Sequence, residues 1–334
     1  MKKGIKRIAM IALVAVMTAV ACASMFACGQ QKDILVVMRE ASSGTREAFD
    51  KYVGLENATF VSTAEEYSST GNVREKVAST ASAIGYISLA SVDDSVKKLK
   101  VEGVEATYDN VRNGSYKISR PFLLLTGNGV ELQPAAQDFF NYCMSKTAEA
   151  SIEAEKGITT SDFATRADYT APETALSGTV VVKGSTSMED MIKKLIAEYQ
   201  KLGGDKVSGV TFTTDFPGSS GGRTAAKEDA TGNVIGLASS AKADAGYTEH
   251  TLCLDAVAVI VNANNTEIDN IDAAGLKAIY TGEVKKFSEL NKHGQKQTER
   301  KSVQSSLCGD GDIVYYRRYR DIRVPDRRKR ACVP

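Results

Sequence analysis

The feature that most constrains this chain is a strand-like run followed by a serine- and glycine-rich loop and a helix start, which occurs three times. The loops are Ser42-Ser43-Gly44-Thr45-Arg46 after the run 34–38, Gly184-Ser185-Thr186-Ser187 after 179–182, and Ser219-Ser220-Gly221-Gly222-Arg223 after 210–213. A helix start carries unpaired N–H groups and the positive end of the helix dipole, so it attracts anions. Such loops in separate parts of one chain predict two lobes that close on one small oxyanion.

The alternation of strand-like and helix-like runs predicts an α/β fold. The runs 34–38, 179–182 and 256–261 are continuously apolar, as buried parallel strands are. Residues 188–199 carry apolar side chains at helical spacing before Gly203-Gly204, Pro134 opens another helix, and 272–280 form a short helix that ends at Gly282. A length of 334 residues predicts about two domains, and the loops would lie at the carboxyl ends of their strands, where ligands bind.

A structural interpretation of these loops stays open beside the functional one. Thr186 and Glu189 have the spacing of a capping box, so that loop could serve only to begin a helix. Arg46 and Arg223 either add positive potential to a cleft or pair with acidic residues on the first helical turn.

The first 27 residues have the layout of a signal peptide. A basic head precedes the apolar run 8–21, which is too short to span a membrane comfortably. Cys28, after Met25-Phe26-Ala27, resembles the lipidated cysteine of a bacterial lipobox, and Cys22 is the second candidate. The alternative is a signal that is cleaved without lipidation.

The charge distribution argues against a nucleic-acid partner. The net charge is +1, but residues 1–27 contribute four positive charges, and 292–334 hold 12 Lys/Arg against 5 Asp/Glu, so residues 28–291 carry −10. A body this acidic must bind an anion with local donors. The tail 292–334 is either a basic arm or a disordered extension, and we expect the extension.

Neither a metal nor a cofactor is expected from the cysteines and histidines. The cysteines have no metal-ligand spacing, and Cys143 and Cys253 lie in apolar segments typical of small buried side chains. His250 and His293 are the only histidines of the sequence.

Several motifs resemble those of the phosphate-binding proteins of phosphate ABC transporters. They are 37–49 with Arg39 and Ser43-Gly44-Thr45, Ala83-Ile84-Gly85-Tyr86, 114–122, Gly184-Ser185-Thr186-Ser187-Met188, Gly218-Ser219-Ser220-Gly221-Gly222 and Ile279-Tyr280-Thr281-Gly282-Glu283. In the usual family order the Gly-Ser-Thr loop comes first, whereas here the later half comes first. The chain therefore resembles a circular permutant of that family.

The resemblance implies a two-lobed periplasmic-binding-protein fold of type II-like topology, with two crossover strands as the hinge. Residues 33–105 and 263–291 would form the lobe that carries Arg39, and residues 115–260 the other. The crossovers would fall near 106–118 and 258–265, with 292–334 as an appendage.

The same resemblance implies the residues that bind phosphate. They are Arg39, Ser43, Gly44, Thr45, Ser185, Thr186, Ser187, Ser219 and Ser240. Ser240 stands where some members place an aspartate that accepts a proton from phosphate, so phosphate and sulfate are less clearly distinguished.

The resemblance implies a monomeric, lipid-anchored protein on the outer face of the bacterial cell membrane. It would capture inorganic phosphate and deliver it to an ABC permease, without being an enzyme. Three alternatives remain: a binder of sulfate or molybdate, a two-lobed module that has lost tight binding, and a serine hydrolase. The hydrolase would use Ser220 in the G-x-S-x-G pattern, with His250 as its base.

Overall fold

The computed structural model describes residues 32–290. The expected signal peptide, the lipidation candidates Cys22 and Cys28, and the basic tail 292–334 lie outside these residues. Within them, none of the helices has both the length and the apolar character that crossing a membrane requires.

Nine strands form one sheet in the order β2-β1-β3-β10-β6-β9-β7-β8, with β4 paired to β10. Two further short strands, β5 and β11, pair with each other. In chain order the strands are β1 (Leu35–Arg39), β2 (Glu65–Tyr67), β3 (Ala83–Ser88), β4 (Val96–Lys98), β5 (Lys100–Val101), β6 (Ser119–Gly127), β7 (Ser177–Gly184), β8 (Gly209–Asp215), β9 (Val234–Ala238), β10 (Tyr247–Asn262) and β11 (Asn270–Ile271).

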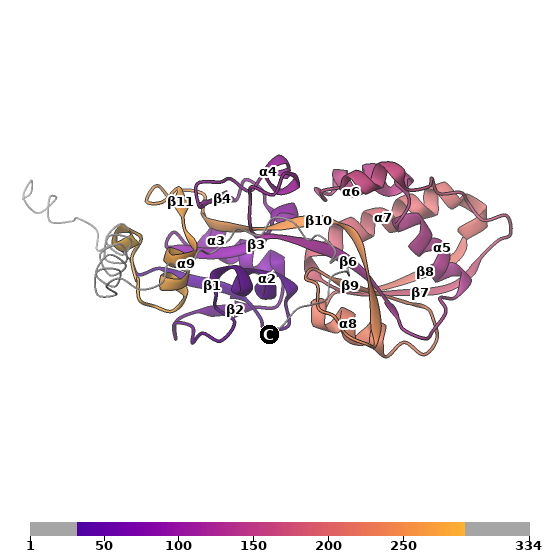
Figure 1. Ribbon diagram of the computed structural model, residues 1–334, viewed down its shortest axis with the longest axis horizontal. Helices are drawn as coiled ribbons and strands as arrows, with labels where there is room; N and C mark the ends of the chain where they lie inside the picture. Colours follow the sequence, from indigo (N-terminus) through magenta and orange to yellow (C-terminus); the bar gives the residue numbers. More distant parts are fainter. Residues whose placement is uncertain (1–31, 291–334) are drawn as a thin grey trace, which may run out of the picture. The chain divides into compact units, whose positions relative to one another are not determined.

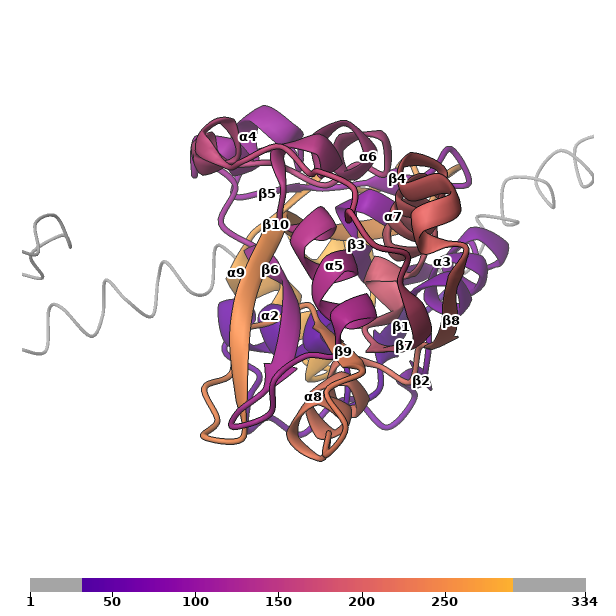
Figure 2. The ribbon, with the colours of Figure 1, turned by 90° about the vertical axis from the view of Figure 1, so that its right-hand side faces the viewer.

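Helices cover the sheet both around β1 and β3 and around β7 and β9 (Figure 1). They are α2 (Gly44–Val53), α3 (Thr70–Ser79), α4 (Tyr108–Arg112), α5 (Pro134–Cys143), α6 (Glu149–Ala154), α7 (Glu189–Gly203), α8 (Ser219–Lys227) and α9 (Ala273–Tyr280). The helix α5 packs against β7 and β9, and Figure 2 shows it beside these strands. The mixed α/β fold expected from the sequence is confirmed.

The buried apolar side chains form two main cores, which define two lobes. The first core is built from β1, β3, α2, α3 and α9 together with the end of β10. The second core is built from α5, α7, β7 and β9 with parts of β6 and β10. Successive residues of β6 alternate between faces, since Leu124 joins the second core while Leu123 and Leu125 pack with Ala226 of α8 on the other side.

The strands β6 and β10 pass from one lobe into the other (Figure 1). Ile118 still belongs to the first core and Phe122 to the second, while on the return Cys253 belongs to the second and Ala256 to the first. The lobe boundaries stated above stay a prediction.

The expectation that 256–261 is a parallel strand is wrong. These residues form the end of β10, which is antiparallel to both β3 and β6. Every residue from 255 to 262 is buried, because β10 lies at the centre of the sheet and α2, α3 and α4 all contact it. A continuous apolar run reports burial on both faces, not strand direction.

The other strand runs fit the parallel expectation, since β1 is parallel to β2 and β3, and β7 is parallel to β8 and β9. The helix predictions also hold. Pro134 is the first residue of α5, and α7 ends at Gly203, with Gly204, whose φ is 51°, as its C-cap. Cys143 and Cys253 are buried, as expected.

The capping box at Thr186 and Glu189 is wrong. A 3-10 turn at Thr186–Met188 separates β7 from α7, and its cap is Ser185, whose Oγ accepts from the Ser187 N–H. The Glu189 carboxylate bonds instead to Lys193, one turn further along α7.

Candidate functional site

The loop between β1 and α2 ends in a capped helix start. The Ser43 Oγ accepts a hydrogen bond from the Thr45 N–H at 3.2 Å, as the N-cap of α2. Gly44 and Thr45 are the first residues of that helix, and both are buried. The cap fixes the position from which the Thr45 side chain extends.

Five hydroxyl groups from both lobes meet in front of this helix start, and we call them the hydroxyl cluster. Its members are Thr45 and Thr70 of the first lobe and Ser187, Ser219 and Ser239 of the second. The Ser187 Oγ lies 3.1 Å from the Thr45 Oγ1 and 3.2 Å from the Thr70 Oγ1. The Ser219 and Ser239 Oγ atoms lie 3.2 Å apart. All five residues are buried.

Gly44 lets the hydroxyl groups come this close to the helix. A Cβ atom at position 44 would lie 2.5 Å from the Ser219 Oγ and 2.8 Å from the Oγ atoms of Ser239 and Ser240. Three serines of the second lobe thus surround one point beside the backbone of α2.

Arg120 links the members of the cluster. Its Nη1 donates to the Thr45 Oγ1 at 2.8 Å and to the Ser239 Oγ at 3.1 Å, and its Nη2 donates to the Ser187 Oγ at 3.2 Å. The same guanidinium pairs with Asp255 of β10, with nitrogen–oxygen distances of 3.0 and 2.8 Å. Arg120 and Asp255 are both buried, so their charges balance within the crossover strands.

Arg39, the last residue of β1, brings a second buried guanidinium. Its Nη1 donates to the Thr70 Oγ1 at 3.0 Å, and its other nitrogens donate to the carbonyl groups of Tyr67 and Ser68. In the described part of the chain it forms no ion pair, although only 1% of its surface is exposed.

Burial and, to a smaller extent, the positive charge of Arg120 lower the pKa of Arg39 to about 10, although Tyr86 and Glu40 act in the opposite direction. Arg39 nevertheless keeps its charge at neutral pH. The site therefore contains one buried positive charge that forms no ion pair with a carboxylate of the described residues.

The structure brings Thr45, Ser187 and Ser219 together, and Gly44 beside them. Thr186 lies at the edge, with its Oγ1 3.1 Å from the Thr70 Oγ1. Three other predicted residues do not belong to the cluster but contact its neighbourhood. Arg39 donates to Thr70, while Ser43 and Ser185 cap the helix starts. Ser240 reaches the point beside Gly44 but bonds to Glu47 and Arg223.

Sequence reasoning missed Arg120, Asp255, Ser239 and Thr70. Arg120 lies within the motif 114–122, whose resemblance to the family implies no role for this arginine, and Ser239 directly precedes the predicted Ser240. Nothing in the spacing of Arg120 and Asp255 indicates that they form a pair, because their contact depends on the antiparallel register of β6 and β10.

Arg46 and Arg223 are ion-pair partners. Arg46 pairs with Asp50 and Glu66, and Arg223 with Glu47 across the lobes. The structural interpretation of these two arginines is confirmed.

The residues of the hydrolase alternative do not meet in the described region. The Ser220 Oγ donates to the Ser42 carbonyl at 3.0 Å, while the His250 Nε2 lies 2.9 Å from the Thr126 Oγ1. Ser220 therefore has its hydrogen bond to the first lobe and none to His250, the histidine of the described residues.

Two α/β cores joined by the strands β6 and β10, with a buried site built from both, define a two-lobed binding protein of the periplasmic type. A model of the PBP superfamily domain matches residues 17–147 and 169–319. The phosphate-binding protein PstS 2 of Streptococcus agalactiae serotype V is 34% identical over 271 residues, which cover 78% of this chain and 88% of that protein. The chain therefore belongs to the PBP superfamily and, within it, to the family of the PstS phosphate-binding proteins.

Two further comparisons differ in how much they cover. A crystal structure of a phosphate-binding protein of a phosphate ABC transporter from Streptococcus pneumoniae is 32% identical with a TM-score of 0.61, and the match covers 77% of this chain and 99% of that one. The phosphate-binding protein PstS of Bacillus subtilis is 34% identical over only 133 residues, or 39% of this chain and 42% of that protein.

Proposed function

We propose that this protein captures inorganic phosphate between its two lobes and delivers it to an ABC permease. The observation that carries the proposal is the buried, unpaired guanidinium of Arg39 behind a cluster of hydroxyl groups. A buried charge without a counter-ion is costly, and an anion bound in the cluster would balance it.

The groups around the cluster suit a tetrahedral oxyanion. Arg120 presents a planar fork of N–H donors, which matches oxyanion geometry. The hydroxyl groups that now bond to one another can turn their protons toward a ligand when the lobes part to admit it. Donors placed in advance in a dry site give specificity without covalent chemistry.

Contacts across the lobes support capture by closure. Arg223 of the second lobe pairs with Glu47 of the first, and Ser220 donates to the Ser42 carbonyl through both its N–H and its Oγ. These contacts surround the cluster and would open as a unit when the lobes swing apart about β6 and β10.

A binder of another oxyanion, such as sulfate, is the second candidate. The sequence at position 240 makes it a candidate, because a serine stands where a carboxylate would reject an anion that has no proton.

The protein's place in the cell is part of the proposal. The layout of residues 1–27 supports export, and Cys28 supports a lipid anchor that would hold a monomer at the outer face of the membrane. The PstS relatives support delivery to a permease in place of enzymatic turnover.

We also propose that the order of the halves arose by circular permutation. The Bacillus subtilis protein matches only 39% of this chain, which supports a different order of the halves in that protein. The match to the Streptococcus pneumoniae structure takes in both halves, which supports a shared order in that branch.

Isothermal titration with phosphate, sulfate and molybdate tests the proposed function. We expect phosphate to bind with a stoichiometry of one. An absence of binding heat for all three anions, confirmed by unchanged thermal stability in their presence, would contradict it.

A further inference from the structure

We propose that Ser240 and Glu47 together make a hydrogen-bond acceptor of the anion site that cannot act as a donor, which selects oxyanions that carry a proton. The inference rests on the proposed function and names its substrate class: hydrogen phosphate and its protonated analogues, as opposed to sulfate. It concerns a position where the sequence lacks the carboxylate that would do this directly.

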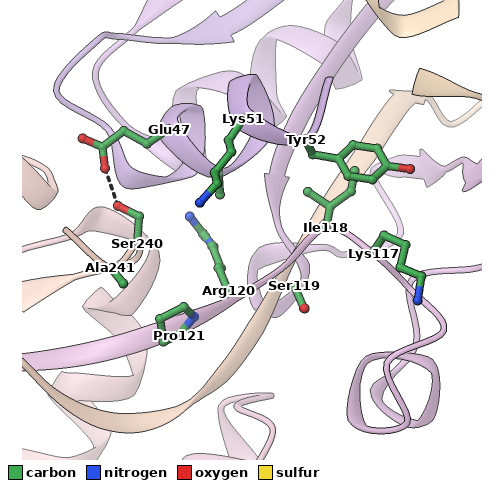
Figure 3. A pocket seen from close by; sticks show the side chains of 11 residues that line it. Glu47, Lys51, Tyr52, Lys117, Ile118, Ser119, Arg120, Pro121, Ser240 and Ala241 are labelled. Atoms are coloured by element: carbon green, nitrogen blue, oxygen red, sulfur yellow. Dashed lines mark hydrogen bonds between the residues drawn. The ribbon is translucent and has the colours of Figure 1, made fainter. Parts of the chain in front are cut away.

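The hydrogen bonds of Ser240 leave it no proton to give to a ligand. A serine hydroxyl has one proton and two lone pairs. The Ser240 Oγ donates its proton to the Glu47 Oε2, as Figure 3 shows, and accepts from the Arg223 Nη2 at 2.6 Å. One lone pair remains, so toward a ligand Ser240 can only accept.

Arg223 fixes this direction. Its Nη1 and Nη2 each donate to one oxygen of Glu47, at 3.1 and 3.0 Å, which is the geometry of an ionised carboxylate. Its Nη2 also donates to the Ser240 carbonyl at 2.7 Å. A carboxylate held in this way accepts from Ser240, and a guanidinium has no lone pair with which to reverse the bond.

The hydroxyl cluster has the opposite polarity. Thr45, Ser187 and Ser239 each accept from Arg120, and Thr70 accepts from Arg39. Their protons are shared only among hydroxyl groups and are therefore available to the oxygens of an anion. Ser219 accepts from the Ser239 N–H and follows the same pattern.

Ser240 lies close enough to this cluster to contact the same ligand. Its Oγ is 2.8 Å from the point beside Gly44 that the Oγ atoms of Ser219 and Ser239 also approach. On their other side, Ser240 and Arg120 line a neighbouring cavity of about 560 Å³, to which none of the cluster hydroxyl groups contributes (Figure 3).

An anion bound here would meet several hydroxyl groups that can donate and, at Ser240, one that can only accept. Hydrogen phosphate has a hydroxyl proton to donate to the Ser240 Oγ. Sulfate has none, so two lone pairs would face each other in a buried site, and that unmade hydrogen bond is costly. The polarity of Ser240 would therefore favour phosphate and arsenate over sulfate and molybdate.

The test is the ratio of sulfate to phosphate dissociation constants, measured by calorimetry on the full chain at neutral pH. We expect a large ratio in the wild type. Glu47→Gln should lower it at least tenfold, because a glutamine can donate to Ser240 and free its proton. Ser240→Ala should lower it similarly, and the double variant no further, because both residues act as one unit.

The ratio separates selectivity from simple loss of closure. Breaking the pair of Glu47 with Arg223 weakens both anions equally and leaves the ratio unchanged. Glu66→Gln, which removes a carboxylate from the Arg46 pair, and Ser95→Ala, which removes a serine bound to Asp93, are matched controls that should leave the ratio at its wild-type value.

The outcomes distinguish this inference from the proposed function. Suppose that both single variants fold, as checked by circular dichroism, and bind phosphate with an unchanged ratio. This result overturns the role of Ser240 and Glu47 but leaves the proposed function intact. A wild type that binds phosphate and sulfate equally does the same. A wild type that binds neither anion overturns both proposals.

Discussion

Two buried arginines give this site its charge, and they do so differently. Arg120 has its own counter-ion in Asp255, whereas Arg39 bonds only to neutral oxygens. The sequence indicates Arg39 through its spacing from Ser43, Gly44 and Thr45. It does not indicate that Thr70 lies between Arg39 and the cluster, because that contact depends on how the loop before α3 folds back on β1.

Replacing Arg39 should weaken phosphate binding far more than folding. Arg39→Met removes the unpaired charge, and we expect the phosphate dissociation constant to rise about 100-fold, or roughly 2.8 kcal/mol. Titration calorimetry measures this change. Arg112→Met, at a half-exposed arginine of α4, is the control that should bind normally. An Arg39→Met protein with wild-type affinity would place the anion elsewhere.

Gly44 is required for the site and not for the helix. Gly44→Ala puts a methyl group within 2.8 Å of three serine hydroxyl groups, so we expect phosphate affinity to fall at least about tenfold. Alanine suits the first turn of α2, so the thermal midpoint should change little. Gly71→Ala, in the first turn of α3 with only the Ser69 Oγ at 4.0 Å, is the matched control. Equal binding by both variants would show that the space beside Gly44 is not used.

At the scale of single elements, the sequence predicts the secondary structure of each segment well. It predicts less well which strand each segment pairs with and in which direction. The strand β1 and the helices α5 and α7 follow from apolar spacing, Pro134 and Gly204. The direction of β10 does not, because a strand buried on both faces has the same apolar run in either direction. The sequence therefore does not predict the pairing of Arg120 with Asp255 either, because this pair depends on the antiparallel register of β6 and β10.

The ion pair of the two crossover strands should be essential for stability. Asp255→Asn leaves the Arg120 charge unpaired in a buried position, which costs about 3–5 kcal/mol of unfolding free energy. Urea denaturation without added anion measures it. Asp269→Asn, in the exposed pair with Lys97, should cost less than about 1 kcal/mol. Similar losses of unfolding free energy in the two variants would show that the buried pair contributes no more to stability than the exposed one.

Helix α2 contains an acid that should make stability depend on pH. Burial raises the pKa of Asp50 to about 6, more than the nearby Arg46 lowers it, and its Oδ1 has no hydrogen-bond partner. Because folding raises this pKa above the usual 3.8, ionised Asp50 destabilises the fold as the pH rises from 4 through 6.

Asp50→Asn should remove that destabilisation. Relative to wild type, we expect the variant to gain roughly 1 kcal/mol of unfolding free energy between pH 4 and pH 8, after allowance for solvent screening. Thermal denaturation across that range measures the difference between the two proteins. A difference that stays constant with pH would contradict the role of Asp50 ionisation.

At the scale of the whole molecule, the described residues form two lobes that share one site. Neither lobe holds a complete set of donors: Thr45 and Thr70 come from the first, while Ser187, Ser219 and Ser239 come from the second. The sequence predicts this division from its three loops, because they lie in distant parts of the chain and their convergence on one anion suggests two lobes that face each other. It does not predict the crossover arginine at their junction.

A crystal structure of the phosphate complex tests the central claim most directly, since that claim concerns where the anion binds. We predict a phosphate beside Gly44, within hydrogen-bond distance of Thr45, Ser219 and Arg120, so that both lobes and a crossover strand contact it. A phosphate bound by one lobe alone, or in the neighbouring cavity by Lys51 and Lys117, would contradict the account.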